Sequence, residues 1–364
     1  MISSTVLIKP VSSLCNCDCK YCFYHDVANS RVVSDYGMIS ENVWKKIIVD
    51  ALLCVDYQEV TFSFQGGEPL LAKPQFYRDF ISYVNEINTD KKVGFTVQTN
   101  GVLIDEEYCM IFKQYDFLVG VSLDGFRENH DFFRFIANDG SFSRVISSIN
   151  RLREYNIRFN IMTVLTNRLA LYPKELYDFY KENEYEYIQI IPCIDNLDDR
   201  DGSFALTPDL YEPFFLELFR LWLDDFLNGK YISINIFDDI ISLLLGRPPV
   251  QCGALGQCQL QCVVESNGDV YPCDFYAIDS FRLGNVLADN MVEISSNTKS
   301  SLFRNYENQT PTILCKECMF SYICHGNCKR IRKVFLNDNF CGYKSLIKAI
   351  YENIPEIISA INNT

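Results

Sequence analysis

Residues 5–22, with the sequence TVLIKPVSSLCNCDCKYC, decide the fold. The first five are mostly β-branched and apolar, so they predict a buried strand over residues 5–9. Directly after it the cysteines have the spacing Cys15-x3-Cys19-x2-Cys22. Three thiolates on one short loop can bind three irons of a [4Fe–4S] cluster and leave the fourth iron open to a small molecule. A zinc loop or a chance cluster is the alternative, and Cys17 inside the motif allows other triplets.

Five further strand candidates follow, with helical patterns between them. The strands are predicted at residues 59–64, 93–99, 117–123, 158–165 and 187–191, and the helices at 41–56, 74–87, 105–114, 142–155 and 173–182. Strands that alternate with helices at this spacing predict βαβ units and a parallel sheet. Six units are too few for a closed eight-stranded barrel, so we expect an α/β fold with a partial (β/α)6 barrel. In such barrels the chemistry lies at the carboxyl ends of the strands.

The second part of the chain has a different pattern. An amphipathic helix is predicted over residues 208–227 and a closing helix over 343–361, with a cysteine-rich region between them. In that region Asn267-Gly268 lies between two β-prone runs and predicts a hairpin. We therefore expect a partial barrel over residues 1–205, a helical linker over 206–250 and a domain organised by metal over 251–364.

The composition is that of an ordinary globular protein, with 48% hydrophobic and 22% charged residues among 364. A net charge of −14 argues against a nucleic-acid partner, because phosphate binding needs a basic surface. No apolar run is long enough to cross a bilayer, and no signal peptide is recognisable. We therefore expect a cytoplasmic protein, in which clustered cysteines are more often metal ligands than disulfides.

Short polar motifs follow the next three strands. Gly66-Gly67-Glu68-Pro69 comes after the second strand; its glycines allow close backbone approach to a ligand, and its carboxylate can take a cationic amino group. Gln98-Thr99-Asn100-Gly101 ends the third strand, and Ser122-Leu123-Asp124-Gly125 ends the fourth. Each motif alone would be an ordinary loop. Their position at successive strand ends is what indicates a binding site.

The cysteine loop, with the aromatic Tyr21 before its last cysteine, resembles the radical S-adenosylmethionine superfamily. The resemblance implies that S-adenosylmethionine binds the open iron and that the GGEP loop holds its methionine amino group. The C-terminal cysteines resemble the SPASM extension, whose two auxiliary clusters would make three [4Fe–4S] clusters in all. By that resemblance the ligands are Cys252, Cys258, Cys273 and Cys328 for one auxiliary cluster, and Cys315, Cys318, Cys324 and Cys341 for the other.

Two zinc sites are the alternative for these C-terminal cysteines, since the pair Cys315-x2-Cys318 alone would permit them. Five cysteines receive no role, and we expect most of them to be buried as small hydrophobic residues. They are Cys17, Cys54, Cys109, Cys193 and Cys262.

Nearly the whole chain resembles the anaerobic sulfatase-maturating enzymes. The strings that carry this resemblance include Ile8-Lys9-Pro10, Cys22-Phe23-Tyr24-His25, Phe64-Gln65-Gly66-Gly67-Glu68-Pro69, Gln98-Thr99-Asn100-Gly101, His130 with Arg134, and Tyr271-Pro272-Cys273-Asp274-Phe275-Tyr276. The last string is the most specific. These enzymes convert a cysteine or serine of a target sulfatase into Cα-formylglycine by means of a 5′-deoxyadenosyl radical.

The resemblance also implies roles for single residues. Asp274 would be the general base that takes the proton of the substrate thiol or hydroxyl. The cofactor contacts would be Tyr21, Gly66, Gly67, Glu68, Pro69, Ser122, Arg134 and Ile194. The substrate peptide would be faced by Tyr24, Gln65 and Gln98. The partners would be an unfolded sulfatase segment and a one-electron reductant such as flavodoxin or ferredoxin.

Three other functions are weighed against this one. A peptide maturase that forms thioether or carbon–carbon crosslinks would share the barrel and the clusters. Such enzymes often add an N-terminal leader-binding domain, for which a strand beginning at residue 5 leaves no room. An electron-transfer module would normally ligate all four irons, which the three-cysteine loop does not. A zinc-stabilised structural protein would contain zinc and lack the visible absorption of iron–sulfur clusters.

Overall fold

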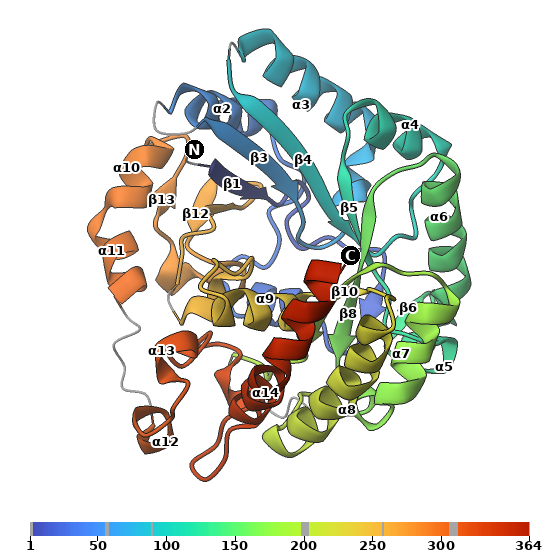
Figure 1. Ribbon diagram of the computed structural model, residues 1–364. Coiled ribbons are helices and arrows are strands. Elements are labelled where there is room, and N and C mark those ends of the chain that lie inside the picture. Colours follow the sequence, from blue (N-terminus) through green and yellow to red (C-terminus); the bar gives the residue numbers. More distant parts are fainter. Residues whose placement is uncertain are drawn as a thin grey trace. The chain divides into compact units, whose positions relative to one another are not determined.

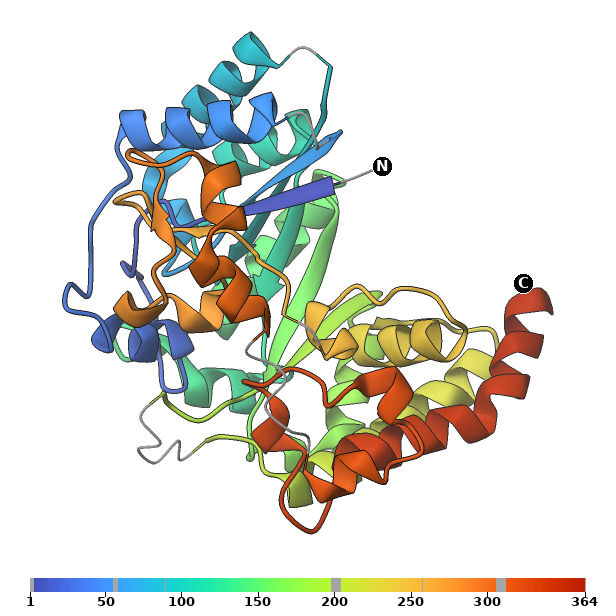
Figure 2. The same cartoon turned by 90° about the vertical axis from the view of Figure 1, so that its left-hand side faces the viewer.

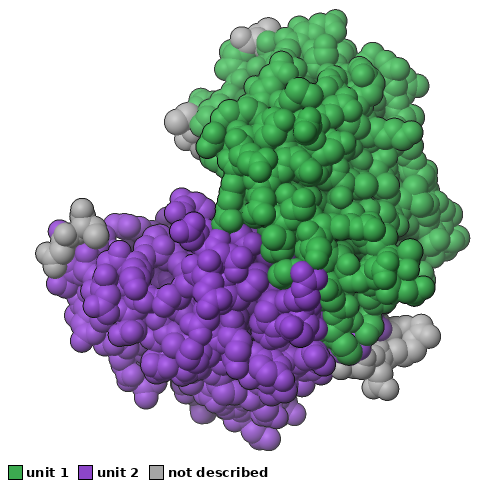
Figure 3. Space-filling model, turned by 90° about the vertical axis from the view of Figure 1, so that its right-hand side faces the viewer, with its two compact units in different colours: residues 1–122, 131–159, 259–305 green, residues 123–130, 160–258, 306–364 purple. Residues whose placement is uncertain are grey.

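The structure is a computed structural model that describes residues 3–54, 58–88, 90–197, 204–256, 258–305 and 312–363. The chain forms two compact units, which Figure 3 shows in different colours. Unit 1 comprises residues 1–122, 131–159 and 259–305, and unit 2 comprises residues 123–130, 160–258 and 306–364. Among the described residues no helix is long and apolar enough to span a membrane.

Unit 1 is built on a sheet that contains the first four predicted strands, all parallel. They are β1 (Ser3–Ile8), β3 (Glu59–Phe64), β4 (Lys92–Thr99) and β5 (Leu118–Ser122), in the spatial order β5-β4-β3-β1 (Figure 1). The helices of this part are α2 (Glu41–Leu53), α3 (Lys73–Ile87), α4 (Glu106–Gln114) and α6 (Phe142–Glu154). Figure 2 shows α2 and α3 on the outer face of β1 and β3. There the Phe80 ring of α3 lies 5.1 Å from Phe62 of β3 and 5.8 Å from Trp44 of α2.

The predicted hairpin extends this same sheet. Its first strand, β11 (Val263–Val264), pairs parallel with β1, so that Leu7 lies opposite Val263. The strands β12 (Asp269–Tyr271) and β13 (Gly284–Asn285) then follow antiparallel. A second, smaller sheet consists of β2 (Asp18–Cys19), β6 (Arg134–Ile136) and β7 (Asp139–Gly140). The remaining helices of unit 1 are α1 (Phe23–Asn29), α10 (Met291–Ser296) and α11 (Thr298–Asn305).

Unit 2 contains the other two predicted strands. They are β8 (Phe159–Leu165), whose first residue belongs to unit 1, and β9 (Tyr187–Pro192); β10 (Ser233–Ile234) pairs parallel with β9. The longer helices are α7 (Pro173–Glu182), α8 (Pro208–Leu227), α9 (Asn235–Leu244) and α14 (Gly342–Asn363), and α14 packs along α8. Two short helices, α12 (Ile313–Lys316) and α13 (Ser321–Cys324), carry cysteines, and α5 (Arg127–Phe133) begins in unit 2 and ends in unit 1.

The α/β prediction is confirmed strand for strand. All six predicted strands are present with ends within two residues of those expected. The predicted helices are also present, although the helix expected over residues 41–56 ends at Leu53. Residues 55 and 56 of that prediction lie outside the described residues. The hairpin is confirmed too, with Gly268 at φ +88° in its turn, a conformation that glycine adopts without steric cost.

Candidate active site

The cysteine loop runs from β1 to α1 and is anchored by the smaller sheet. In that sheet Cys19 lies opposite Arg134, and Arg134 Nη1 donates to Cys19 Sγ over 3.7 Å. Cys15 Sγ accepts from Asn100 Nδ2 over 3.9 Å, and Cys22 is the residue that precedes α1. Donors placed on the sulfurs favour thiolates, the form that binds metal.

Burial distinguishes the four cysteines of this loop. Cys17 is 5% exposed, whereas Cys15, Cys19 and Cys22 are partly exposed. A hydrogen bond from the Cys17 side chain lowers the pKa of Cys15 to about 6. Cys17 is therefore the most buried of the four, and the choice of Cys15, Cys19 and Cys22 as the ligands stays a prediction. Next to the loop, the Arg134 guanidinium lies 5.4 Å from the centroid of the Tyr21 ring.

The GGEP loop packs directly against the cysteine loop. Glu68 N donates to Leu14 O at 2.8 Å, and a Cβ on Gly67, at φ +49°, would lie 2.1 Å from the same oxygen. A Cβ on Gly66 would instead lie 2.3 Å from Cε of Lys9. Both glycines are thus required by atoms of the chain itself, whatever the loop binds.

The Glu68 carboxylate is fully buried, and the chain's own donors reach it. It accepts hydrogen bonds from Leu70 N at 3.0 Å, Thr99 Oγ1 at 2.7 Å and Asn100 N at 2.8 Å. Burial raises the pKa of Glu68 to about 7. This carboxylate therefore joins the loop after β3 to the end of β4. Its contact with a cationic amino group stays a prediction.

Two predicted contact residues at the strand ends lie close together, since Gln98 Nε2 donates to Ser122 Oγ at 3.2 Å. Pro69 is buried at the start of a short 3-10 helix, and its carbonyl accepts from the Tyr77 hydroxyl at 2.8 Å. Ile194 is a half-buried residue of unit 2, two positions after β9. The roles of these residues in binding stay predictions.

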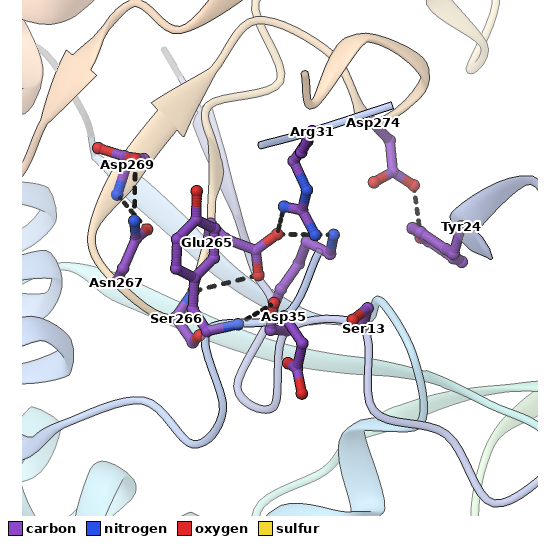
Figure 4. Close-up of polar contacts among 12 residues, drawn as sticks. Ser13, Tyr24, Arg31, Asp35, Glu265, Ser266, Asn267, Asp269 and Asp274 are labelled. Atoms are coloured by element: carbon purple, nitrogen blue, oxygen red, sulfur yellow. Dashed lines mark hydrogen bonds and ion pairs between the residues drawn. The ribbon is translucent and has the colours of Figure 1, made fainter. Parts of the chain in front are cut away.

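Asp274 begins a short 3-10 helix after β12, and its carboxylate meets a tyrosine from α1. Tyr24 Oη donates to Asp274 Oδ2 at 2.5 Å (Figure 4). The same hydroxyl lies 3.4 Å from Gln65 Oε1. The other carboxylate oxygen, Oδ1, is buried and has no hydrogen-bond partner among the described residues. Burial raises the pKa of Asp274 to about 6. The structure thus brings together the predicted base and two of the predicted substrate contacts.

Sequence reasoning missed a buried ion cluster beside this pair. Glu265, in the hairpin turn, accepts from Lys9 Nζ at 2.9 Å and also binds Arg31 (Figure 4). All three side chains are at most 2% exposed, and Lys9 Nζ lies 5.3 Å from the centroid of the Tyr24 ring. Burial disfavours the charge on Glu265, but the two cations outweigh it and hold the pKa of Glu265 below its ordinary value. The available signal was a lysine at the end of an apolar strand, which alone predicts nothing.

The C-terminal cysteines of unit 2 include one complete predicted ligand set. A cavity of about 580 Å³ is lined by all four of its thiols: Cys315, Cys318, Cys324 and Cys341. In the other set, Cys252 lies near Cys328. Gly253 directly follows Cys252, and a Cβ on Gly253 would lie 2.9 Å from Cys328 Cβ. Cys258 also belongs to unit 2, whereas Cys273 belongs to unit 1.

None of the sixteen cysteines is in a disulfide. Four of the five without a predicted role are buried as expected, and Cys262 is half-buried. Within the described parts of the chain, no three His, Cys, Asp or Glu side chains converge on one metal-ion position. Groups of three and four cysteine thiols are a donor set that [4Fe–4S] clusters take, and the choice of clusters over zinc stays a prediction.

Comparison with known proteins agrees with this chemistry. The family model of the radical SAM superfamily matches residues 10–179, and that of the SPASM iron–sulfur cluster-binding domain matches residues 252–319. The fold and the cysteine loop thus define a radical S-adenosylmethionine protein with a SPASM domain.

The similarity extends over the full length of particular relatives. A cysteine-type anaerobic sulfatase-maturating enzyme of Clostridium novyi is 39% identical over 96% of this chain and 95% of its own. A serine-type enzyme of Bacteroides thetaiotaomicron is 30% identical over 97% of this chain and 89% of its own. A solved structure of native anSMEcpe with bound AdoMet superimposes with a TM-score of 0.89 at 35% identity, over 99% of this chain and 100% of that one. The chain belongs to the family of anaerobic sulfatase-maturating enzymes, and both the predicted family and the predicted partial barrel are confirmed.

Proposed function

We propose that this protein oxidises a cysteine of a target sulfatase to Cα-formylglycine, using S-adenosylmethionine and three [4Fe–4S] clusters. The observation that carries the proposal is the Asp274 carboxylate, which has one oxygen bound by Tyr24 and the other buried without a partner among the described residues. A buried carboxylate oxygen without a hydrogen-bond partner can accept a proton from a bound substrate. It lies on the string that is most specific to the family.

The chain's residues fit the groups that the family implies. Cys15, Cys19 and Cys22 would hold the cluster with the open iron, and the C-terminal cysteines would hold the two auxiliary clusters. When bound, these groups would supply hydrogen-atom abstraction from the substrate Cβ and an acceptor for the second electron. The GGEP loop, Ser122, Arg134, Tyr21 and Ile194 would position S-adenosylmethionine.

Asp274 is suited to take the proton that the oxidation releases. Its pKa of about 6 leaves the carboxylate ionised at neutral pH, while burial keeps it basic enough to accept a proton. Tyr24 occupies Oδ2 and so leaves Oδ1 for the substrate, and Gln65 and Gln98 would contact the peptide. The –CH2–SH group would lose one hydrogen atom, one proton and one electron to give a thioaldehyde. Water would then replace the sulfur, releasing hydrogen sulfide and leaving the aldehyde.

Cysteine is the substrate that we favour over serine. A thiol with an ordinary pKa near 8.5 releases its proton to a carboxylate far more readily than an alcohol does. The partners in this proposal are an unfolded sulfatase segment and a one-electron carrier such as flavodoxin or ferredoxin. A cytoplasmic location is part of the proposal, because iron binding requires reduced thiols and the cytosol keeps thiols reduced.

The test is mass spectrometry after anaerobic incubation of the reconstituted protein with S-adenosylmethionine, a reductant and a peptide containing Cys-x-Pro-x-Arg. Formylglycine formation lowers the peptide mass by about 18 Da, the difference between a thiol and an aldehyde. Asp274→Asn should still form 5′-deoxyadenosine but little aldehyde. The matched control is Asp178→Asn on the exposed surface of α7, which should behave as wild type. A crosslinked product without aldehyde would reject the proposal in favour of a peptide maturase.

A further inference from the structure

One segment of the chain carries a charge opposite to that of the rest. Residues 312–352 contain seven Lys and Arg and three Asp and Glu, a net charge of +4 in a chain of net charge −14. The remainder of the chain therefore carries −18. A local excess of one sign on a protein of the other sign creates a field that attracts and orients a complementary partner.

Three of these lysines line the cavity that contains the four thiols of one predicted cluster. They are Lys316, Lys344 and Lys348, all exposed, and the lining includes no Asp or Glu. Lys344 and Lys348 lie one turn apart on α14, so both project from one side of the helix. Lys348 is 3.7 Å from Glu352, a pair with both side chains well exposed, which weakly offsets its charge.

Exposed apolar side chains accompany the lysines. Ile313 of α12 is 74% exposed, Met319 is 61% exposed and Tyr322 of α13 is 68% exposed. Tyr322 also lines the cavity. Tyrosine and methionine are enriched at the cores of protein interfaces, where they supply contact that charge alone does not. Both components of a transient interface are therefore present beside the thiols.

We propose that this lysine face, defined by Lys316, Tyr322, Lys344 and Lys348, docks an acidic one-electron carrier protein. The inference rests on the proposed function, because a carrier that docks here would exchange electrons with a cluster bound by the neighbouring thiols. The acidic remainder of the chain repels an acidic carrier, so the lysine face also selects the site and the orientation of docking. A charged docking face suits a partner that must dissociate after each encounter.

The test measures binding directly, by isothermal titration calorimetry of the reconstituted holoenzyme with oxidised flavodoxin under anaerobic conditions. Neither S-adenosylmethionine nor substrate peptide is present. The variant Lys316→Glu/Lys344→Glu/Lys348→Glu is compared with Lys45→Glu/Lys92→Glu/Lys174→Glu, which changes three lysines that are exposed elsewhere. Each triple change moves the net charge from −14 to −20, so the two variants match in total charge. The control breaks three surface ion pairs and the lysine-face variant breaks one, and pairs of this kind contribute little to stability.

The lysine-face variant should raise the Kd for flavodoxin at least about tenfold at low salt, and the control less than about threefold. Wild-type affinity should fall as salt is added. Iron content and visible absorption check that the variants are folded. If the charge-reversed lysine-face variant loses iron, Lys316→Gln/Lys344→Gln/Lys348→Gln replaces it, with a smaller expected loss of affinity. Equal weakening in both charge-reversed variants, salt-independent binding, or no binding by wild type would overturn the proposal. Failure of the peptide assay with docking intact would count against the proposed function alone.

Discussion

Glu265→Gln tests whether the buried ion cluster holds unit 1 together. Glu265 is the anion shared by Lys9 and Arg31, and the three side chains are at most 2% exposed. The substitution keeps the size of the side chain and removes its charge. Two buried cations then lose the carboxylate that both of them bind, which is a costly arrangement in a low-dielectric interior.

The expected loss can be estimated from the structure. Removing one partner of a buried ion pair costs about 3–5 kcal/mol. At about 2.1 cal/mol/K per residue, unfolding 364 residues has an entropy of about 0.8 kcal/mol/K, so this loss lowers the apparent Tm by about 4–6 °C. The matched control is Glu107→Gln, which breaks the exposed Arg78–Glu107 pair at 2.7 Å. A surface pair of this kind is worth less than about 1 kcal/mol.

The assay is thermal unfolding of the anaerobic holoenzyme, with wild type and both variants measured side by side. Because the pKa of Glu265 is lowered in the fold, its contribution is present above the ordinary glutamate pKa and is lost only as pH falls through the lowered value. The difference between wild type and Glu265→Gln should therefore be constant between about pH 6 and pH 8. A Tm within about 1 °C of the Glu107→Gln variant would refute the structural role of the cluster.

Three further predictions concern the site itself. Tyr24→Phe removes the donor to Asp274 Oδ2, so formylglycine yield per 5′-deoxyadenosine should fall about tenfold, measured by mass spectrometry and chromatography of the same sample. Gly67→Ala places a Cβ 2.1 Å from Leu14 O at a strained φ, and should lower S-adenosylmethionine binding and the apparent Tm together. Replacing all three thiols of the predicted triplet in the cysteine loop by alanine should leave about eight irons per chain and abolish 5′-deoxyadenosine formation; retained cleavage would reject that loop as the catalytic cluster site.

Local patterns were enough to predict the elements of the fold. The strands and helices follow from hydrophobic periodicity, and the hairpin follows from Asn267-Gly268, because these signals lie within a few residues of one another. The partner of the hairpin was not predictable in this way. β11 pairs with β1, more than 250 positions earlier, and that choice depends on which sheet edge remains available after the barrel strands pair. The ion pair between Lys9 and Glu265 is a consequence of that long-range pairing.

The two glycines of the GGEP loop show that a motif can locate a functional loop without revealing which atoms require glycine there. The sequence attributes both to the approach of a ligand. In the structure Gly67 is required by the backbone of the cysteine loop. Gly66 is required by the side chain of Lys9, which passes beside it and binds Glu265. The string Ile8-Lys9-Pro10, Gly66 and the turn of the C-terminal hairpin therefore share one packing requirement. A change at any of these three places should disturb the ion cluster, and with it the position of the Tyr24–Asp274 pair on which the proposed chemistry depends.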